Sequence, residues 1–286
     1  MFKRILVPLD GSDRAEQAIP VAARIARASG GTVILVQATP SPVDFRAEKK
    51  LLAEVYSENV IEEVKALAIN YLDNARRMAE LVGVQTEMRV EYGDVAPSIL
   101  AAVEALEVDL IVMCSHGYTG FKRWIMGSVA DKITRHAPVP VLILREGAPL
   151  PALASHQPVR ALAALDGSPL SEAVFEPVAY LVAGLAHATS QQGELRLLRV
   201  VDLPFSSGKL KSQAYIDSET RDEAVKVAQD YLGSLTARLE EGGLADLNIA
   251  VTTSVESDPD VAEAGCSILS WAVLPSACCI TANCPC

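Results

Sequence analysis

One stretch of the chain, residues 109–128, constrains the fold more than any other. An apolar run, Asp-Leu-Ile-Val-Met-Cys, ends in a loop that contains Gly117 and Gly120, and Gly127 and Ser128 follow the loop. A short, continuous apolar run is typical of a parallel strand that is buried on both faces. Glycine allows the chain to turn sharply and to approach a ligand closely. The order of strand, glycine loop and helix start therefore predicts an α/β fold with an anion site at the loop.

The helix after this loop is predicted to begin at Ser128. Ser128 is the expected N-cap, and Asp131, three residues later, completes a capping-box pattern. The first turn of a helix has unpaired N–H groups and the positive end of the helix dipole, which together favour a phosphate. Glycines alone are a weak signal, so an ordinary connection between a strand and a helix remains the alternative.

Strand-like and helix-like segments alternate through the first half of the chain. Strands are predicted at residues 3–10, 32–38, 85–91, 109–114 and 139–144, and helices at residues 13–29, 49–81, 95–106 and 128–136. Pro20 is expected to interrupt the first helix, with a kink as one form of the interruption, and Gly30-Gly31 to end it. Because strands joined by helices form parallel, right-handed units, we expect a flavodoxin-like, doubly wound sheet of five parallel strands.

The same pattern starts again after a proline-containing linker at residues 147–159. The segment Ala-Leu-Ala-Ala-Leu-Asp-Gly-Ser echoes Ile-Leu-Val-Pro-Leu-Asp-Gly-Ser, so that Asp166 matches Asp10. The match continues through a second strand, a long helix and a third strand. An internal repeat of this length predicts two tandem copies of one α/β unit, a complete one at residues 1–146 and a partial one at residues 160–264.

The last segment, residues 265–286, departs from this repeat. It has no glycine loop and no periodicity, and it contains five of the six cysteines, so it is predicted to be an irregular tail. A metal site would have to use cysteines whose spacing is not the usual one for zinc, so we expect no metal. Those cysteines are Cys278, Cys279, Cys284 and Cys286.

Charge and hydropathy narrow the classes of partner. The formal net charge of −11 argues against nucleic acid and anionic membranes, although a local helix dipole can still bind a nucleotide. Pro8 and Asp10 interrupt the first apolar run, so we expect no signal peptide, and no run is long and apolar enough to span a bilayer. A cytoplasmic location is the expectation.

Two motifs resemble those of the universal stress protein family. They are Val-Pro-Leu-Asp-Gly-Ser in the first strand and the stretch from Ser115 to Ile133. Gly117, nine further residues and then Gly127-Ser128 resemble the second half of the family's nucleotide signature, whereas Cys114 replaces its first glycine. The resemblance covers residues 1–145 and 160–264. It implies a tandem-domain member with a truncated second domain, in a family that has ATP-binding and non-binding subgroups.

The resemblance also implies which residues form the nucleotide site. The adenine and its ribose are expected at Pro8, Leu9, Asp10 and Ala38, the far side of the ribose at Met113, Cys114 and Gly117, and the phosphates at Gly127, Ser128 and Val129. Asp10 and Cys114 also follow strands that flank the predicted switch point of the sheet, where ligands bind. For Asp10, capping of its own helix is the alternative role.

Three functions follow as hypotheses. The resemblance implies an ATP-binding stress-response module, with Mg²⁺ and at most slow hydrolysis. A non-binding interaction protein, in which Cys114 blocks the pocket, and a slow ATPase or nucleotidyl-transfer enzyme are the alternatives; no catalytic residue is assigned. The second copy lacks the phosphate half and is not expected to bind ATP.

Related proteins pair through their last strands, so we expect an exposed apolar edge at residues 139–144 and a homodimer, or pairing of the two copies.

Overall fold

The computed structural model describes residues 1–39, 58–115, 127–144, 159–187, 192–201, 218–241, 245–256, 272–274 and 278–281. The chain divides into two compact units. The first contains Met1–Ser155 and Ser276–Cys286, and the second contains His156–Pro275.

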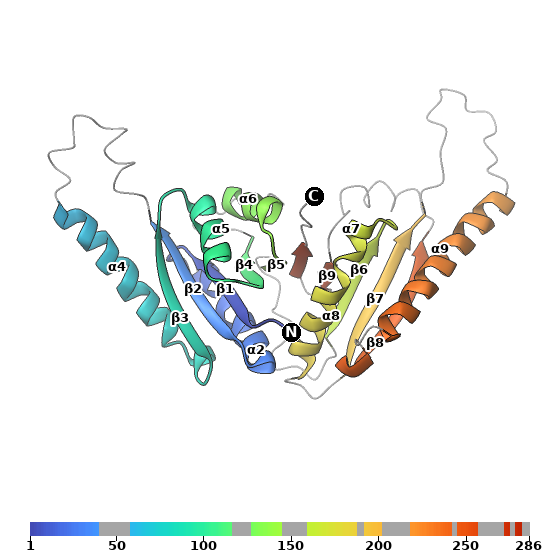
Figure 1. The fold of residues 1–286 in the computed structure, drawn as a ribbon, viewed down its shortest axis with the longest axis horizontal. Coiled ribbons are helices and arrows are strands. Elements are labelled where there is room, and N and C mark those ends of the chain that lie inside the picture. The colour runs from blue at the N-terminus through green and yellow to red at the C-terminus, as the bar shows by residue number, and fades with distance from the viewer. Residues whose placement is uncertain are drawn as a thin grey trace, which may run out of the picture. The chain divides into compact units, whose positions relative to one another are not determined.

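The first unit is built on a sheet of five parallel strands, β1 to β5 (Figure 1). Their order is β3-β2-β1-β4-β5. The strands are β1 (Arg4–Leu9), β2 (Thr32–Thr39), β3 (Gln85–Tyr92), β4 (Leu110–Cys114) and β5 (Val141–Leu144). The helices are α1 (Asp13–Glu16), α2 (Ala18–Ser29), α4 (Glu58–Arg76), the 3-10 helix η1 (Ala79–Leu81), α5 (Val95–Ala105) and α6 (Ser128–His136). The predicted flavodoxin-like, doubly wound fold is confirmed.

Aliphatic side chains fill both faces of this sheet. On one face, Leu6, Ile34 and Ile111 pack with residues of α5 and α6, including Ile99 and Ile133. The helices α2 and α4 cover the other face (Figure 1). Strand β1 lies in the middle, and its Ile5, Leu6 and Val7 have no exposed surface. Because both faces are covered, the strands are the near-continuous apolar runs expected of a parallel sheet.

The helix predicted at residues 13–29 is divided into two helices. The break between α1 and α2 falls at Gln17, three residues before Pro20. Pro20 has no N–H to donate to the carbonyl of Glu16, four residues earlier, so the interruption expected from Pro20 is found as this break, and Pro20 itself lies in the first turn of α2. Gly30 ends α2 in a left-handed conformation, with φ 61°, as predicted.

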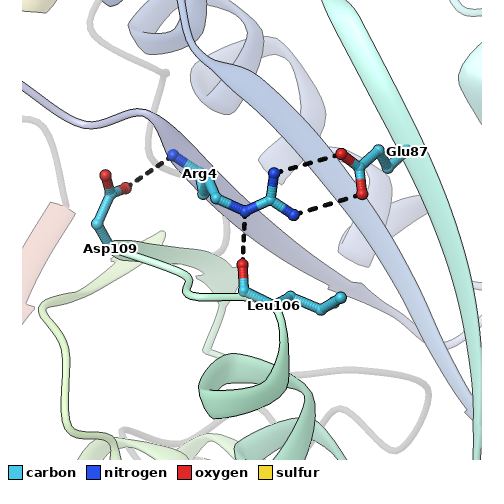
Figure 2. Close-up of polar contacts among 4 residues, drawn as sticks. All are labelled: Arg4, Glu87, Leu106 and Asp109. Carbon is cyan, nitrogen blue, oxygen red and sulfur yellow. Dashed lines mark hydrogen bonds and ion pairs between the residues drawn. The ribbon is translucent and has the colours of Figure 1, made fainter.

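Arg4 holds the amino end of the sheet together (Figure 2). Its guanidinium pairs with both carboxylate oxygens of Glu87 on β3, at 3.3 and 3.4 Å, and its Nε donates to the Leu106 carbonyl. Asp109 accepts from the backbone N–H groups of Lys3 and Arg4, at 2.6 and 3.0 Å. Together these bonds link β1 to β3 and to the turn before β4.

The second unit has the element order of the first part of the first unit. Its parallel strands are β6 (Arg160–Leu165), β7 (Gly193–Val200) and β8 (Ile249–Glu256). Its helices are α7 (Pro169–Glu172), α8 (Phe175–His187), α9 (Ser218–Leu239) and the 3-10 helix η3 (Ala245–Leu247). Leu165 lies opposite Arg199, as Leu9 lies opposite Gln37 in the first unit. On the other edge of β6, where β1 has the parallel strand β4, the short strand β9 (Ala272–Leu274) pairs antiparallel.

The tail predicted to be irregular contains two short strands, β9 and β10 (Cys278–Thr281). β10 pairs antiparallel with β5, so that Cys278 lies opposite Leu144 and Thr281 opposite Val141. Val141–Leu144 are at most 3% exposed. The prediction of an exposed edge over these residues is therefore wrong, because an unpaired strand edge is a template for any segment that can hydrogen-bond to it, and the tail supplies one.

No helix in the described ranges is both long enough and apolar enough to cross a membrane.

Candidate functional site

The predicted site residues gather at the carboxyl edge of the first sheet. Pro8 and Leu9 end β1 and Asp10 follows them, while Met113 and Cys114 end β4. Ala38 is the penultimate residue of β2. Strands β2 and β4 flank β1 on opposite sides, and connections that leave a parallel sheet in opposite directions open a crevice at this edge. Gly117 lies outside the described residues.

Asp10 stabilises the turn that leads from β1 into α1. Its Oδ1 accepts from the Ser12 N–H at 3.0 Å and from the Ser12 hydroxyl at 2.6 Å. The Ser12 hydroxyl in turn accepts from the Ala15 N–H at 3.2 Å, which makes Ser12 the N-cap of α1. The alternative role foreseen for Asp10 is thus divided between two residues: Ser12 caps the helix, and Asp10 orders Ser12. The Asp10 side chain is exposed at the edge of the crevice.

Cys114 lies beside Asp10 but turns its thiol towards α1. Its Sγ donates to the Arg14 carbonyl at 2.9 Å. Burial, and then the negative charge of Asp10, raise the pKa of the Cys114 thiol to about 12, so the thiol is neutral at physiological pH. The side chain that replaces the first glycine of the family signature is therefore held by contacts within the protein.

The start of α6 is anchored to the end of β4. The Gly127 N–H donates to the Ser115 carbonyl at 2.9 Å, and the Asp131 N–H donates to the Gly127 carbonyl at 2.8 Å. Gly127, with φ −60° and ψ 150°, is the N-cap, and Ser128 is the first helical residue. The N–H groups of Ser128 and Val129 are in the first turn, where no intrahelical carbonyl can reach them.

The predicted capping box at Ser128 and Asp131 is wrong. No side chain of the described residues caps α6, and both carboxylate oxygens of Asp131 accept from the Arg135 Nε at 3.0 Å. An acid at this position can bond either to the helix start or to a cation one turn later, and here Arg135 provides the cation. The helix start is therefore left without a competing side-chain acceptor, which favours an external anion.

Three further residues near Asp10 were not foreseen as part of the site. Glu16 and Asp10 lie close to Tyr71 of α4, and burial, followed by the charge of Glu16, raises the pKa of the Tyr71 hydroxyl. A bond to Glu16 also contributes to this shift, whereas the Gln37 Oε1 is buried and has no hydrogen-bond partner among the described residues. The internal repeat contains the signal that could have identified two of them, because Glu16 recurs as Glu172 and Tyr71 as Tyr231.

The fold is that of a doubly wound α/β protein, in which β1 and β4 flank the switch point of the sheet. The Universal stress protein family matches residues 1–145, and the chain belongs to this family. It is similar to universal stress protein YxiE of Bacillus subtilis, with 30% identity over 148 residues, which are 51% of this chain and 100% of that protein. It is also similar to universal stress protein MJ0531 of Methanocaldococcus jannaschii, with 32% identity over 146 residues, which are 51% of this chain and 84% of that protein.

A solved structure agrees with the fold. A universal stress protein from Archaeoglobus fulgidus aligns with 89% of this chain and 77% of its own, at 22% identity and a TM-score of 0.55. Another universal stress protein, solved in complex with cAMP, aligns with 50% of this chain and 95% of its own, at 24% identity and a TM-score of 0.36.

Proposed function

We propose that the first unit binds an adenine nucleotide, ATP with Mg²⁺, and that the protein acts as a nucleotide-dependent module of the stress response. The observation that supports this proposal is the convergence of a carboxylate and a helix N-terminus at one edge of the sheet. Asp10 follows β1, and the start of α6 is tied through Ser115 to the neighbouring strand β4. A carboxylate can accept from ribose hydroxyls, and the first turn of a helix favours phosphate.

Each predicted residue has a role in this proposal. Pro8, Leu9 and the backbone of Ala38 line the adenine, and Met113, Cys114 and Gly117 line the ribose. The N–H groups of Ser128 and Val129 face the phosphates, and Gly127, whose own N–H is bonded to the Ser115 carbonyl, lets the helix start approach them closely. Mg²⁺ keeps several waters and is commonly bound through substrate phosphates, so the protein needs no dedicated metal cage for it.

The second unit, in this proposal, is an incomplete tandem copy of the first. Its strands β6, β7 and β8 have the order and register of β1, β2 and β3. In the described residues, the antiparallel strand β9 takes the place that β4 has in the first unit, and no helix corresponds to α6. We therefore expect one nucleotide for each chain.

A non-binding interaction protein is the second candidate, because Cys114 replaces the first glycine of the signature. The hydrogen bond from its Sγ to the Arg14 carbonyl argues against a complete block, since the thiol is directed into the protein. An enzyme is less well supported. Asp131, the acid nearest in sequence to the proposed phosphate position, is paired with Arg135.

Calorimetric titration with ATP and Mg²⁺ tests the proposal. Asp10→Asn keeps the oxygen that orders Ser12 and removes the charge, and we expect it to weaken binding by about tenfold, or ~1.4 kcal/mol. The matched variant Asp166→Asn should leave affinity and stoichiometry unchanged. Gly127→Val, at a φ of −60° that any residue adopts, should weaken binding by placing a side chain at the helix start. A wild-type protein that binds no nucleotide would favour the interaction protein.

A further inference from the structure

The two units have the same arrangement of side chains next to the aspartate that follows their first strand. Each unit has this aspartate, a glutamate at the end of the following short helix, a tyrosine on the long helix, and a polar residue opposite the last residue of the first strand. The two sets are Asp10, Glu16, Tyr71 and Gln37 in the first unit, and Asp166, Glu172, Tyr231 and Arg199 in the second. The units thus differ in one member, glutamine against arginine.

In the second unit, the arginine completes the arrangement. The Arg199 guanidinium carbon lies 4.7 Å from the centre of the Tyr231 ring, within the range of a cation–π contact. Both of its terminal nitrogens lie 3.3 Å from the point where a Cβ on Gly167 would be. The guanidinium therefore fills the space between the tyrosine ring and the turn that follows β6.

The remaining polar groups of the second unit are also paired. The Tyr231 hydroxyl donates to Glu172 Oε1 at 2.9 Å, and Glu172 Oε2 accepts from Arg238 at 3.1 Å. Asp166 accepts from the Ser168 N–H at 2.8 Å. Burial, and then the bond to Glu172, raise the pKa of Tyr231 to about 12, so its hydroxyl remains a donor at physiological pH.

In the first unit, the same space is open. A Cβ built on Gly11, the counterpart of Gly167, would meet no atom of the described residues within 4 Å. Gln37 is too short and carries no charge to replace the guanidinium, and its Oε1 is buried without a partner among those residues. The Tyr71 hydroxyl is a different case, because a bond to Glu16 contributes to its raised pKa, as the bond to Glu172 does for Tyr231. Buried polar atoms cost free energy unless something pairs with them.

We propose that Arg199 is a built-in occupant of the second unit's site, and that Gln37 leaves the matching site of the first unit open to a ligand. Two carboxylates, an amide oxygen and a tyrosine ring attract planar groups that carry hydrogen-bond donors. The guanidinium is such a group. The nucleoside half of a nucleotide, with its amino group and ribose hydroxyls, is another, and this assignment of the ligand rests on the proposed function. Gln37 accordingly keeps the nucleoside part of the first site open, in addition to β4 and α6, which have no counterpart among the described residues of the second unit.

The test is to close the first site in the full chain with Gln37→Arg, using Gln37→Met as a control of similar length without charge. Without ligand, the new arginine should find the partners that Arg199 has, and scanning calorimetry should show an unfolding midpoint raised by about 2 °C or more. In titrations with ATP and Mg²⁺, Gln37→Arg should weaken binding at least about tenfold, whereas Gln37→Met should stay within about threefold of wild type.

The reciprocal variant Arg199→Gln provides an independent measurement. It should lower the unfolding midpoint, because it removes the cation from the Tyr231 ring and from the Gly167 turn. Its control is Arg196→Gln on the same strand, where the exposed arginine bonds only to the Ser254 hydroxyl, at 3.1 Å, among the described residues. This variant should leave the midpoint unchanged.

Several outcomes would overturn the inference. An unchanged or lower midpoint for Gln37→Arg would do so, and so would wild-type ATP affinity in that variant. An Arg199→Gln protein as stable as the Arg196→Gln control would contradict the role of Arg199. If the wild-type protein binds no ATP, the proposed function fails, and the two midpoint measurements then decide this inference alone.

Discussion

Arg4 and Arg160 begin the first strand of the two units and differ in what they hold. The Arg4 side chain, 31% exposed, pairs with Glu87 and donates to the Leu106 carbonyl, so it joins three segments that are far apart in the sequence (Figure 2). The Arg160 side chain, 59% exposed, bonds to Glu194 on the neighbouring strand at 2.7 Å. The arginine at this position therefore connects three segments of the first unit, whereas in the second unit it forms only an exposed ion pair among the described residues.

Arg4→Ala should lower the free energy of unfolding by about 1–2 kcal/mol, because a carbonyl and a carboxylate lose a charged donor. Arg160→Ala should change it by less than about 0.5 kcal/mol, since exposed ion pairs contribute little. Urea denaturation of the two variants, followed by circular dichroism, measures both effects. Equal losses of unfolding free energy in the two variants would show that the bond from Arg4 to the Leu106 carbonyl adds no measurable stability.

The Cys114 thiol should be unreactive in the folded protein. Because its pKa is raised from 9.0 to about 12, it has almost no thiolate at pH 8, and we expect iodoacetamide to modify it only when urea is added. Peptide mass spectrometry measures the modification at this site. Rapid labelling of Cys114 in the native protein would show that the thiol is not held against Arg14.

The same shift predicts a dependence of stability on pH. The unfolded thiol ionises near pH 9 and the folded thiol near pH 12, so its contribution is fully present below pH 9 and is lost as the pH rises towards 12. Stability should therefore fall more steeply over this range in the wild type than in Cys114→Ala. Parallel pH profiles of the two proteins would contradict this.

At the scale of the element, the local sequence predicts the strands and helices well but not the details of their ends. Pro20 interrupts the first helix as expected, but the break falls at Gln17, three residues before the proline. The N-cap of α6 is Gly127, although Ser128 is the better capping residue. In the second case the Gly127 N–H is bound to the carbonyl of Ser115, the residue after β4, so a partner distant in sequence determines where the helix starts.

The edge of β5 is paired within the full chain, and we expect this pairing to prevent dimers through that edge. In the full chain β10 pairs with it, and both strands belong to the first unit. A chain truncated after Ala264 would lack β10, and we expect the bare apolar edge to promote homodimers, which light scattering at low micromolar concentration detects. The truncated chain should keep the ATP affinity of the full chain, since Asp10 and α6 are intact. A truncated protein that remains monomeric would contradict the first expectation.

At the scale of the whole molecule, the two units differ in what lies at the carboxyl edge of their sheets. The first unit has a strand and a helix start, β4 and α6, near its aspartate, together with a buried amide oxygen on Gln37 that has no partner among the described residues. The second has an arginine in the corresponding space. A chain with net charge −11 can still bind an anion under this proposal, because the relevant field is that of one helix start.

The sequence by itself determined the fold class and the strand ends at which the proposed site residues lie, and it displays the repeat on which the proposed tandem copies rest. These features depend on local periodicity and on repetition, which one chain displays directly. The tertiary structure decided which groups contact one another. The Cys114 thiol donates to the carbonyl of Arg14, β10 pairs with the edge of β5, and the Arg199 guanidinium lies over the Tyr231 ring. The physical reason is that these partners lie far apart along the chain, and only packing of the elements brings them within reach.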